Sequence, residues 1–189
     1  MATAEQVNEL LTKMAEERGR LVEQVRGIGE EDAHAVPVGK TGEEEWTIKE
    51  QLAHLCEMEL GYDMWVEAAL GEENPNVSGL AAPRSAIPIE EANGHAVAEL
   101  LEVMAGERED TLKLIHGLSL EQFDRRATHP MFGTLTVMQW LRSFYRHDRM
   151  HADQIAGREP EYKPKFTGTE PNQRASRIAQ VQARQRQDG

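Results

Sequence analysis

Four long stretches of the sequence place apolar residues at alternating steps of three and four, which is the period of an amphipathic α-helix. They cover approximately residues 7–28, 46–70, 88–118 and 136–155. No run of useful length alternates with a period of two, so we do not expect a sheet. Four amphipathic helices of similar length predict an all-α fold, a four-helix bundle. Long connections flank the second stretch, so the up-and-down order of the helices is not predicted.

Two helix starts carry a recognisable signal. Thr47 with Glu50, and Thr136 with Gln139, have the spacing of a capping box, in which two side chains satisfy backbone N–H groups at the start of a helix. The segments between the helices are rich in residues that break helices. They predict loops at 34–45 and 72–87, a short helical turn at 119–123 and a turn at 128–133.

The chain has 189 residues and a net charge of −12. An acidic body repels phosphate backbones, so we expect no nucleic-acid partner. No apolar window is long enough to cross a membrane, and the N-terminus lacks the pattern of a secretory signal. The single cysteine, Cys56, excludes an internal disulfide and suits a reducing compartment. We therefore expect a cytoplasmic protein.

The charge is unevenly distributed along the chain. Residues 162–189 carry six basic and two acidic side chains and almost no core-forming residues. We therefore divide the chain into a helical domain, 1–161, and a basic C-terminal extension, 162–189. The extension either packs on a partner subunit or is a disordered tail, and its charge makes a homodimer a testable expectation.

Two histidines on the last helix indicate a metal site. His147 and His151 are four residues apart, so their imidazoles project from one face of the helix and can bind one ion. That face follows the apolar seam, and buried imidazoles need partners. His54, beside the apolar face of the second helix, is the best third ligand. Three imidazoles would leave coordination positions open for water or substrate, as in catalytic sites.

These histidines also have other interpretations. A pair at this spacing is common by chance, and HDRMH resembles the HExxH pattern of zinc peptidases, with Asp148 in place of glutamate. No histidine follows His151 to complete such a peptidase site, which argues against it. His129 is an intermediate case because it precedes the helix that carries the pair. The remaining histidines fit surface or helix-end positions.

Charged residues interrupt the apolar seams of three helices, at Arg18, Glu59 and Arg108. Buried charges are costly unless they are paired, so one hypothesis is a polar layer in the middle of the bundle, with Glu59 bound to an arginine. The alternative is that the helices rotate slightly and the long side chains reach solvent. Cys56 fits a small packed side chain better than a nucleophile or ligand.

Three blocks of sequence together resemble the DinB/YfiT-like superfamily. They are WTIKEQLAHL at 46–55, HPMFGTLTVMQWL at 129–141 and YRHDRMHADQI at 145–155. The resemblance implies a four-helix bundle, often dimeric, that holds a divalent metal on three histidines, which map onto His54, His147 and His151. Members with known activity include thiol S-transferases and a maleylpyruvate isomerase that use bacillithiol or mycothiol, and others resemble metal-dependent hydrolases.

The function expected from these observations is a metal-dependent enzyme acting on a small molecule, with Zn, Ni or Fe on the three histidines. Transfer of a low-molecular-weight thiol cosubstrate is the first hypothesis. Hydrolysis at the same site and a non-catalytic metal-binding or interaction bundle are the alternatives. Asp148, Glu57 and Glu59 are candidates for orienting the ligands from behind.

Overall fold

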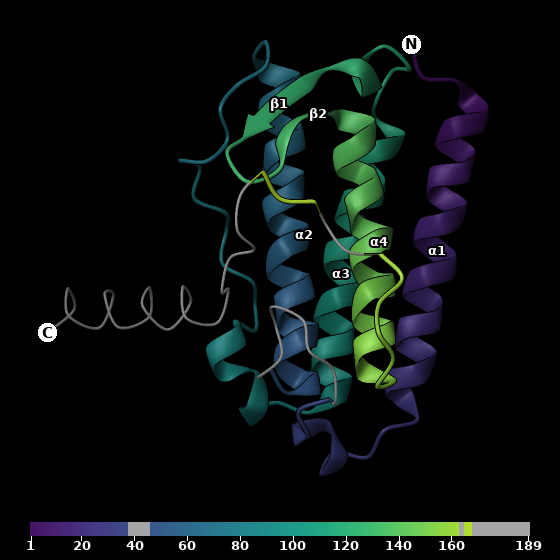
Figure 1. Ribbon diagram of the computed structural model, residues 1–189, viewed down its shortest axis with the longest axis vertical. Coiled ribbons are helices and arrows are strands. Elements are labelled where there is room, and N and C mark those ends of the chain that lie inside the picture. Colours follow the sequence, from purple (N-terminus) through teal and green to yellow (C-terminus); the bar gives the residue numbers. More distant parts are fainter. Residues whose placement is uncertain (38–45, 163–164, 168–189) are drawn as a thin grey trace, which may run out of the picture.

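Four long helices form the predicted bundle in the computed structural model, which describes residues 1–37, 46–162 and 165–167 (Figure 1). The long helices are α1 (Ala4–Arg26), α2 (Ile48–Gly71), α3 (Val97–His116) and α4 (Val137–Ile155). Three short 3₁₀ helices accompany them: η1 (Asp32–His34), η2 (Ile89–Gly94) and η3 (Gln122–Asp124). The all-α four-helix architecture is confirmed. Most of the extension 162–189, and part of the 34–45 loop, lie outside the described residues.

Capping boxes start three of the helices. Those of α2, from Thr47 and Glu50, and of α4, from Thr136 and Gln139, confirm the predicted starts. A third box at the start of α1 was not predicted. The start predicted near residue 88 was wrong, because residues 89–94 form η2 and α3 begins only at Val97.

The expectation that the chain has no sheet was also wrong. Strands β1 (Arg126–His129) and β2 (Gly133–Thr136) pair antiparallel between η3 and α4, with Ala127 opposite Leu135. Four-residue strands are too short to show a period of two. Facing threonines support the pairing, since the hydroxyls of Thr128 and Thr134 lie 2.8 Å apart.

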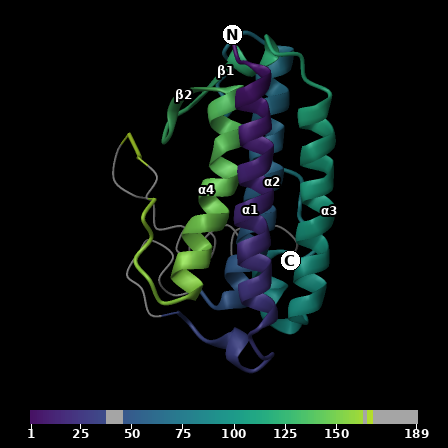
Figure 2. The same cartoon turned by 90° about the vertical axis from the view of Figure 1, so that its right-hand side faces the viewer.

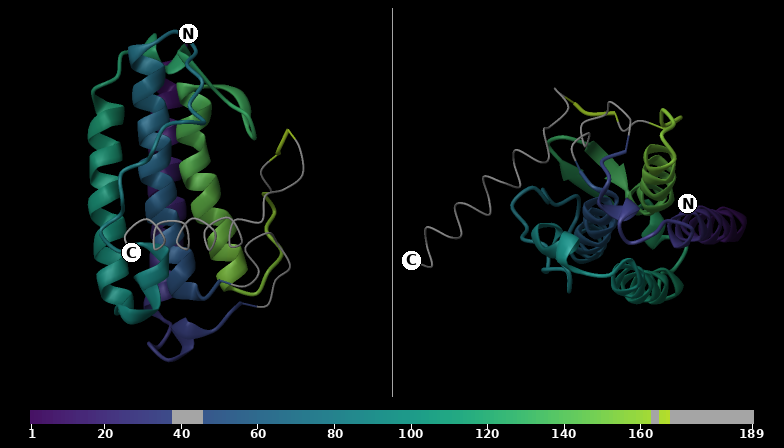
Figure 3. Two further views of the ribbon diagram at one scale, coloured as in Figure 1. Left: turned by 90° about the vertical axis from the view of Figure 1, so that its left-hand side faces the viewer. Right: turned by 90° about the horizontal axis from the view of Figure 1, so that it is seen from below.

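The helices do not alternate in direction. The 72–96 connection runs back along the bundle, so α2 and α3 point the same way, and α1 and α4 point the opposite way (Figures 1 and 2). Helix α4 packs against α1 and α2, and α2 packs against α3 (Figure 3). Among the described residues, no helix has the length and apolar content of a membrane span.

The core consists of two apolar clusters, one above the other. One includes Met14, Tyr62 and Phe144, and the other includes Leu21 and Leu52. On each helix, one charged residue lies between the two clusters. These residues are Arg18 on α1, Glu59 on α2, Arg108 on α3 and Asp148 on α4. We call these four residues the charge ring.

The hairpin turn needs a glycine, whereas the middle of α1 does not. Gly133 has φ +76°, a conformation that costs an L residue about 1–2 kcal/mol. Gly19 is exposed within α1, and a Cβ there would meet nothing within 4 Å. We expect Gly133→Ala to lower the free energy of unfolding by about 1 kcal/mol and Gly19→Ala to raise it by about 1 kcal/mol. Urea denaturation measures both, and equal signs would contradict this assignment.

Candidate metal centre

Three histidines from two helices come together where α2 packs on α4. His54 projects from α2, and His147 and His151 project from successive turns of α4. One donor nitrogen from each lies within 4.8 Å of the others. The His54 ring centroid is 4.9 Å from that of His147 and 5.4 Å from that of His151. The helical spacing of the pair and the predicted third histidine therefore converge on one place.

The two imidazoles of α4 face each other through the same type of nitrogen. The Nε2 atoms of His147 and His151 are 3.0 Å apart. Behind His151, the amide oxygen of Gln51 lies 2.9 Å from Nδ1. An amide oxygen only accepts, so Nδ1 of His151 carries the proton and Nε2 presents its lone pair toward the other histidines.

Gln51, in the first turn of α2, and Trp46, just before the N-cap of that helix, hold this arrangement. Gln51 is 2% exposed and fixes the tautomer of His151. The ring of Trp46 packs on that of His54 at a centroid distance of 4.5 Å. The role of Gln51 was not predicted from the sequence. The available signal was a polar residue on the buried face of α2, three positions before His54.

The donor set fits a divalent ion. Nitrogens that share one Zn²⁺ at Zn–N distances of about 2.0–2.1 Å lie roughly 3 to 4 Å apart. The measured 3.0 Å pair and the 4.8 Å limit on the trio agree with that spacing after small side-chain adjustments. His54 and His151 are 3% and 0% exposed, so little water competes for their nitrogens. Metal binding itself stays a prediction.

The charge ring lies next to the histidines and confirms the predicted polar layer. Glu59 accepts hydrogen bonds from Arg18 at 2.6 Å and from Arg108 at 2.5 and 3.1 Å. Asp148 accepts from Arg18 Nε at 3.1 Å and from Arg108 Nη2 at 3.0 Å. Each arginine thus binds both carboxylates, and the two positive and two negative charges balance.

The three carboxylates proposed to orient ligands lie in two different places. Asp148 and Glu59 both belong to the charge ring, whose carboxylates bind arginines. The Glu57 carboxylate accepts the backbone N–H of Ile89 at 3.2 Å, at the start of η2. Glu57 therefore anchors the connection between α2 and α3.

His129 lies in the hairpin and is not part of the three-histidine group. Its Nδ1 accepts the backbone N–H of Met131, and its ring packs against Trp65 at 4.8 Å. Burial lowers the pKa of His129, so the ring is neutral at pH 7. Cys56 is 1% exposed, and burial together with the charge of Glu107 raises the pKa of its thiol. It is therefore no nucleophile.

Asp63 extends the polar layer at the interface of α2 and α3. Thr111 Oγ1 lies 2.7 Å from Asp63 Oδ2, 3.0 Å from Glu59 Oε1 and 3.2 Å from the Glu107 carbonyl oxygen. One hydroxyl proton cannot serve three acceptors. Burial and the charge of Glu59 raise the pKa of Asp63 to about 7. A protonated Asp63 donates to Thr111, which then donates to one of its other acceptors.

The chain matches a known protein family over most of its length. The model of the DinB superfamily matches residues 13–155, which include all three histidines and the whole charge ring. The chain belongs to the DinB superfamily. A relative from Bacillus subtilis, the uncharacterized protein YuaE, is 26% identical over 146 residues, which cover 70% of this chain and 86% of YuaE.

Solved structures of DinB-like proteins share the fold. YfiT from Bacillus subtilis, described as a probable metal-dependent hydrolase with an unusual four-helix bundle topology, superposes with a TM-score of 0.67 at 16% identity. The match covers 82% of this chain and 87% of YfiT. A mycothiol-dependent maleylpyruvate isomerase superposes with a TM-score of 0.62 at 15% identity, over 79% of this chain and 60% of the isomerase.

Asp63 makes the stability of this DinB-superfamily chain depend on pH. Its pKa is about 7 in the folded state and near 3.8 in the unfolded chain, so the native state binds the proton more tightly. Stability therefore falls as pH rises between about 4 and 7, by up to about 1.4 kcal/mol per pH unit. Asp63→Asn keeps a donor to Thr111 and removes this dependence.

We expect Asp63→Asn to stabilise the protein by about 2 kcal/mol more at pH 8 than at pH 5. Urea unfolding of both proteins at the two pH values measures the difference. An exposed carboxylate replaced in the same way, Asp110→Asn, is the control. A pH-independent difference between Asp63→Asn and the wild type would show that Asp63 is ionised across this range.

Proposed function

We propose that this chain is a divalent-metal-dependent enzyme that transfers a low-molecular-weight thiol to a small electrophile. The observation that carries the proposal is the set of three imidazole nitrogens within 4.8 Å of one another, supplied by two packed helices. Three protein ligands leave coordination positions open, which is typical of catalytic sites. An ion bound there would act as a Lewis acid that lowers the pKa of a thiol or a water in an open position.

The side chains of this chain supply positioning. Gln51 keeps the His151 lone pair at Nε2, and the Trp46 ring packs against the His54 ring at an angle of 55°. The ring centroid of Tyr62 lies 6.3 Å from that of His147, so the Tyr62 ring adds apolar surface beside this histidine. The sole cysteine is buried, so a thiol that reacts here has to come from a cosubstrate.

Hydrolysis is the second candidate. It rests on the likeness to YfiT, whose described activity is that of a probable metal-dependent hydrolase and 87% of whose length is matched. The same ligands and the same open positions would serve a water in place of a thiol. The thiol proposal has its own parallel in the mycothiol-dependent isomerase, of which this chain spans about three-fifths.

Metal content tests the ligand set. We expect purified protein to hold one equivalent of a divalent ion by elemental analysis. His151→Ala should weaken metal binding by more than about 100-fold, the upper end for loss of an outer-shell partner. His116→Ala, at the exposed end of α3, is the matched control and should bind as the wild type does. Equal metal affinity in both variants would refute the site.

Turnover separates the two chemistries. We expect conjugation of bacillithiol or mycothiol to 1-chloro-2,4-dinitrobenzene, lost on treatment with a chelator and restored by the ion found in the protein. A p-nitrophenyl ester hydrolysed without any thiol, with the same metal dependence, would instead support the hydrolase. A protein that binds metal and catalyses neither reaction would contradict both proposals and favour a non-catalytic bundle.

A further inference from the structure

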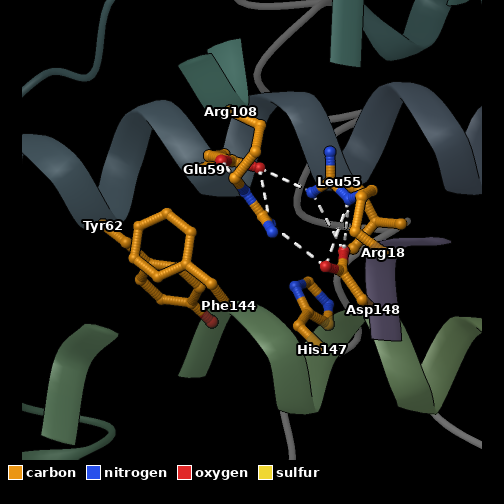
Figure 4. Close-up of a pocket in the computed structure, with 8 residues that line it drawn as sticks. All are labelled: Arg18, Leu55, Glu59, Tyr62, Arg108, Phe144, His147 and Asp148. Atoms are coloured by element: carbon orange, nitrogen blue, oxygen red, sulfur yellow. Dashed lines mark hydrogen bonds and ion pairs between the residues drawn. The ribbon is translucent and has the colours of Figure 1, made fainter. Parts of the chain in front are cut away.

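A pocket with a volume of about 420 Å³ lies between the end of α1 and the start of α3. It is far larger than the cavity beside the charge ring, whose volume of about 10 Å³ suits a single water molecule (Figure 4). Pockets of roughly 300–1,000 Å³ are typical of binding sites. We call the larger one the α1–α3 pocket and ask what it could bind.

Aliphatic side chains form the wall of the α1–α3 pocket. Val25 of α1, Ile28 after that helix, and Val97 and Leu101 of α3 all line it. Ile28 and Leu101 are only partly buried, so the described part of the chain leaves apolar surface open here. Burial of apolar surface is worth about 25 cal/mol per Å², so a partner with aliphatic side chains would be stabilised in this pocket.

The edge of the pocket is acidic on balance. Glu30, Glu102 and Arg26 line it with exposed side chains. The surrounding domain, residues 1–161, contains 31 acidic and 15 basic side chains. An apolar wall within an acidic edge favours a partner segment that combines aliphatic and basic residues.

The C-terminal extension has this combination. Residues 168–189 lie outside the described part of the chain, and their sequence contains two large aliphatic residues, Ile178 and Val181. Three arginines lie on either side of this pair in the sequence: Arg174, Arg177 and Arg184. With four arginines and two acidic residues, this stretch is basic. Its charge is therefore opposite to that of the pocket edge.

The place where the extension starts favours a second copy of the chain as its source. The backbone N–H of Thr167 donates to the carbonyl of Met131 in the hairpin. The hairpin and the α1–α3 pocket lie on opposite sides of the bundle (Figures 2 and 3). The extension of the same chain would have to pass around the bundle, whereas a second copy can present its extension directly.

We propose that the α1–α3 pocket receives residues 174–184 of a second copy, which joins two chains into a homodimer. Ile178 and Val181 contact the aliphatic wall, and the arginines face the acidic edge. In a twofold dimer the contact is reciprocal, so each chain supplies one extension and one pocket. The contact does not involve the three histidines and is therefore independent of the proposed function.

Cysteine crosslinking tests which chain supplies the extension. Two full-length variants are mixed: Ala98→Cys has a thiol at the pocket, and Ala179→Cys has one beside Ile178. Cys56 is 1% exposed, so a disulfide that joins the two different variants reports contact between copies. We expect at least about 10-fold more of this product than with Ser119→Cys in place of Ala98→Cys, because binding raises the local concentration of the partner thiol. Ser119 is exposed beyond the other end of α3.

Sedimentation velocity measures the dimer itself. We expect Ile178→Asp and Glu102→Lys each to raise the dissociation constant of the dimer at least about 10-fold. The first variant places a charge against an apolar wall, and the second places like charges together. Gln187→Asp, away from the aliphatic pair, and Glu121→Lys, at an exposed site near the hairpin end, are the matched controls. Both should stay within about twofold of the wild type.

A chain that remains monomeric at every concentration, or that crosslinks equally at residues 98 and 119, would overturn the proposal. A dimer whose dissociation constant is unchanged in both Ile178→Asp and Glu102→Lys would also overturn it, because other faces of the bundle would then hold the two copies together. The metal content of both variants should equal that of the wild type. The dimer contact and the metal centre can therefore be rejected separately.

Discussion

The mutual neutralisation of four buried charges, one from each helix, is the constraint on which this bundle depends. A buried charge without a partner is strongly unfavourable in an apolar interior. Removal of one member of the ring would therefore leave an opposite charge buried and unpaired. Arg18, Glu59, Arg108 and Asp148 satisfy one another only when all four helices are docked at one height. Packing of apolar side chains tolerates a shift along a helix, but this ring does not. It therefore sets the register of the helices, and with it the height of His54 relative to His147 and His151.

Much of this was predictable from the sequence because it depends on periodicity. The four helices, two capping boxes and the convergence of three histidines follow from residue spacing on a helix. The presence of Arg18, Glu59 and Arg108 in apolar seams predicted a polar layer. For Asp148 the sequence pattern suggests a peptidase base or a ligand-orienting group. Its membership in the layer depends on how α4 rotates against α1 and α3, which spacing alone does not determine.

The parts that escaped prediction depend on contacts between distant segments. The hairpin 126–136 forms from strands too short to show a pattern, and it is fixed by a close approach to the 72–96 connection, where Thr128 pairs with Asn76. Gln51 acquires its role only because α4 brings His151 against it. The raised pKa of Asp63 arises mainly from burial where α2 packs on α3, with a smaller contribution from the charge of Glu59 on the same helix. The partners of the hairpin and of Gln51 are far from them in sequence, and burial at a helix interface depends on how the helices pack.

The described end of the chain returns to the hairpin. The backbone N–H of Thr167 donates to the carbonyl of Met131 at 2.8 Å, and Phe166 packs on Phe132 with ring centroids 5.6 Å apart. The stretch of chain from the hairpin turn through α4 to Thr167 therefore begins and ends at the same place, where non-covalent contacts join its two ends. The segment that follows α4 is tied to the hairpin that precedes it, and both flanks of this helix are held at one place on the bundle.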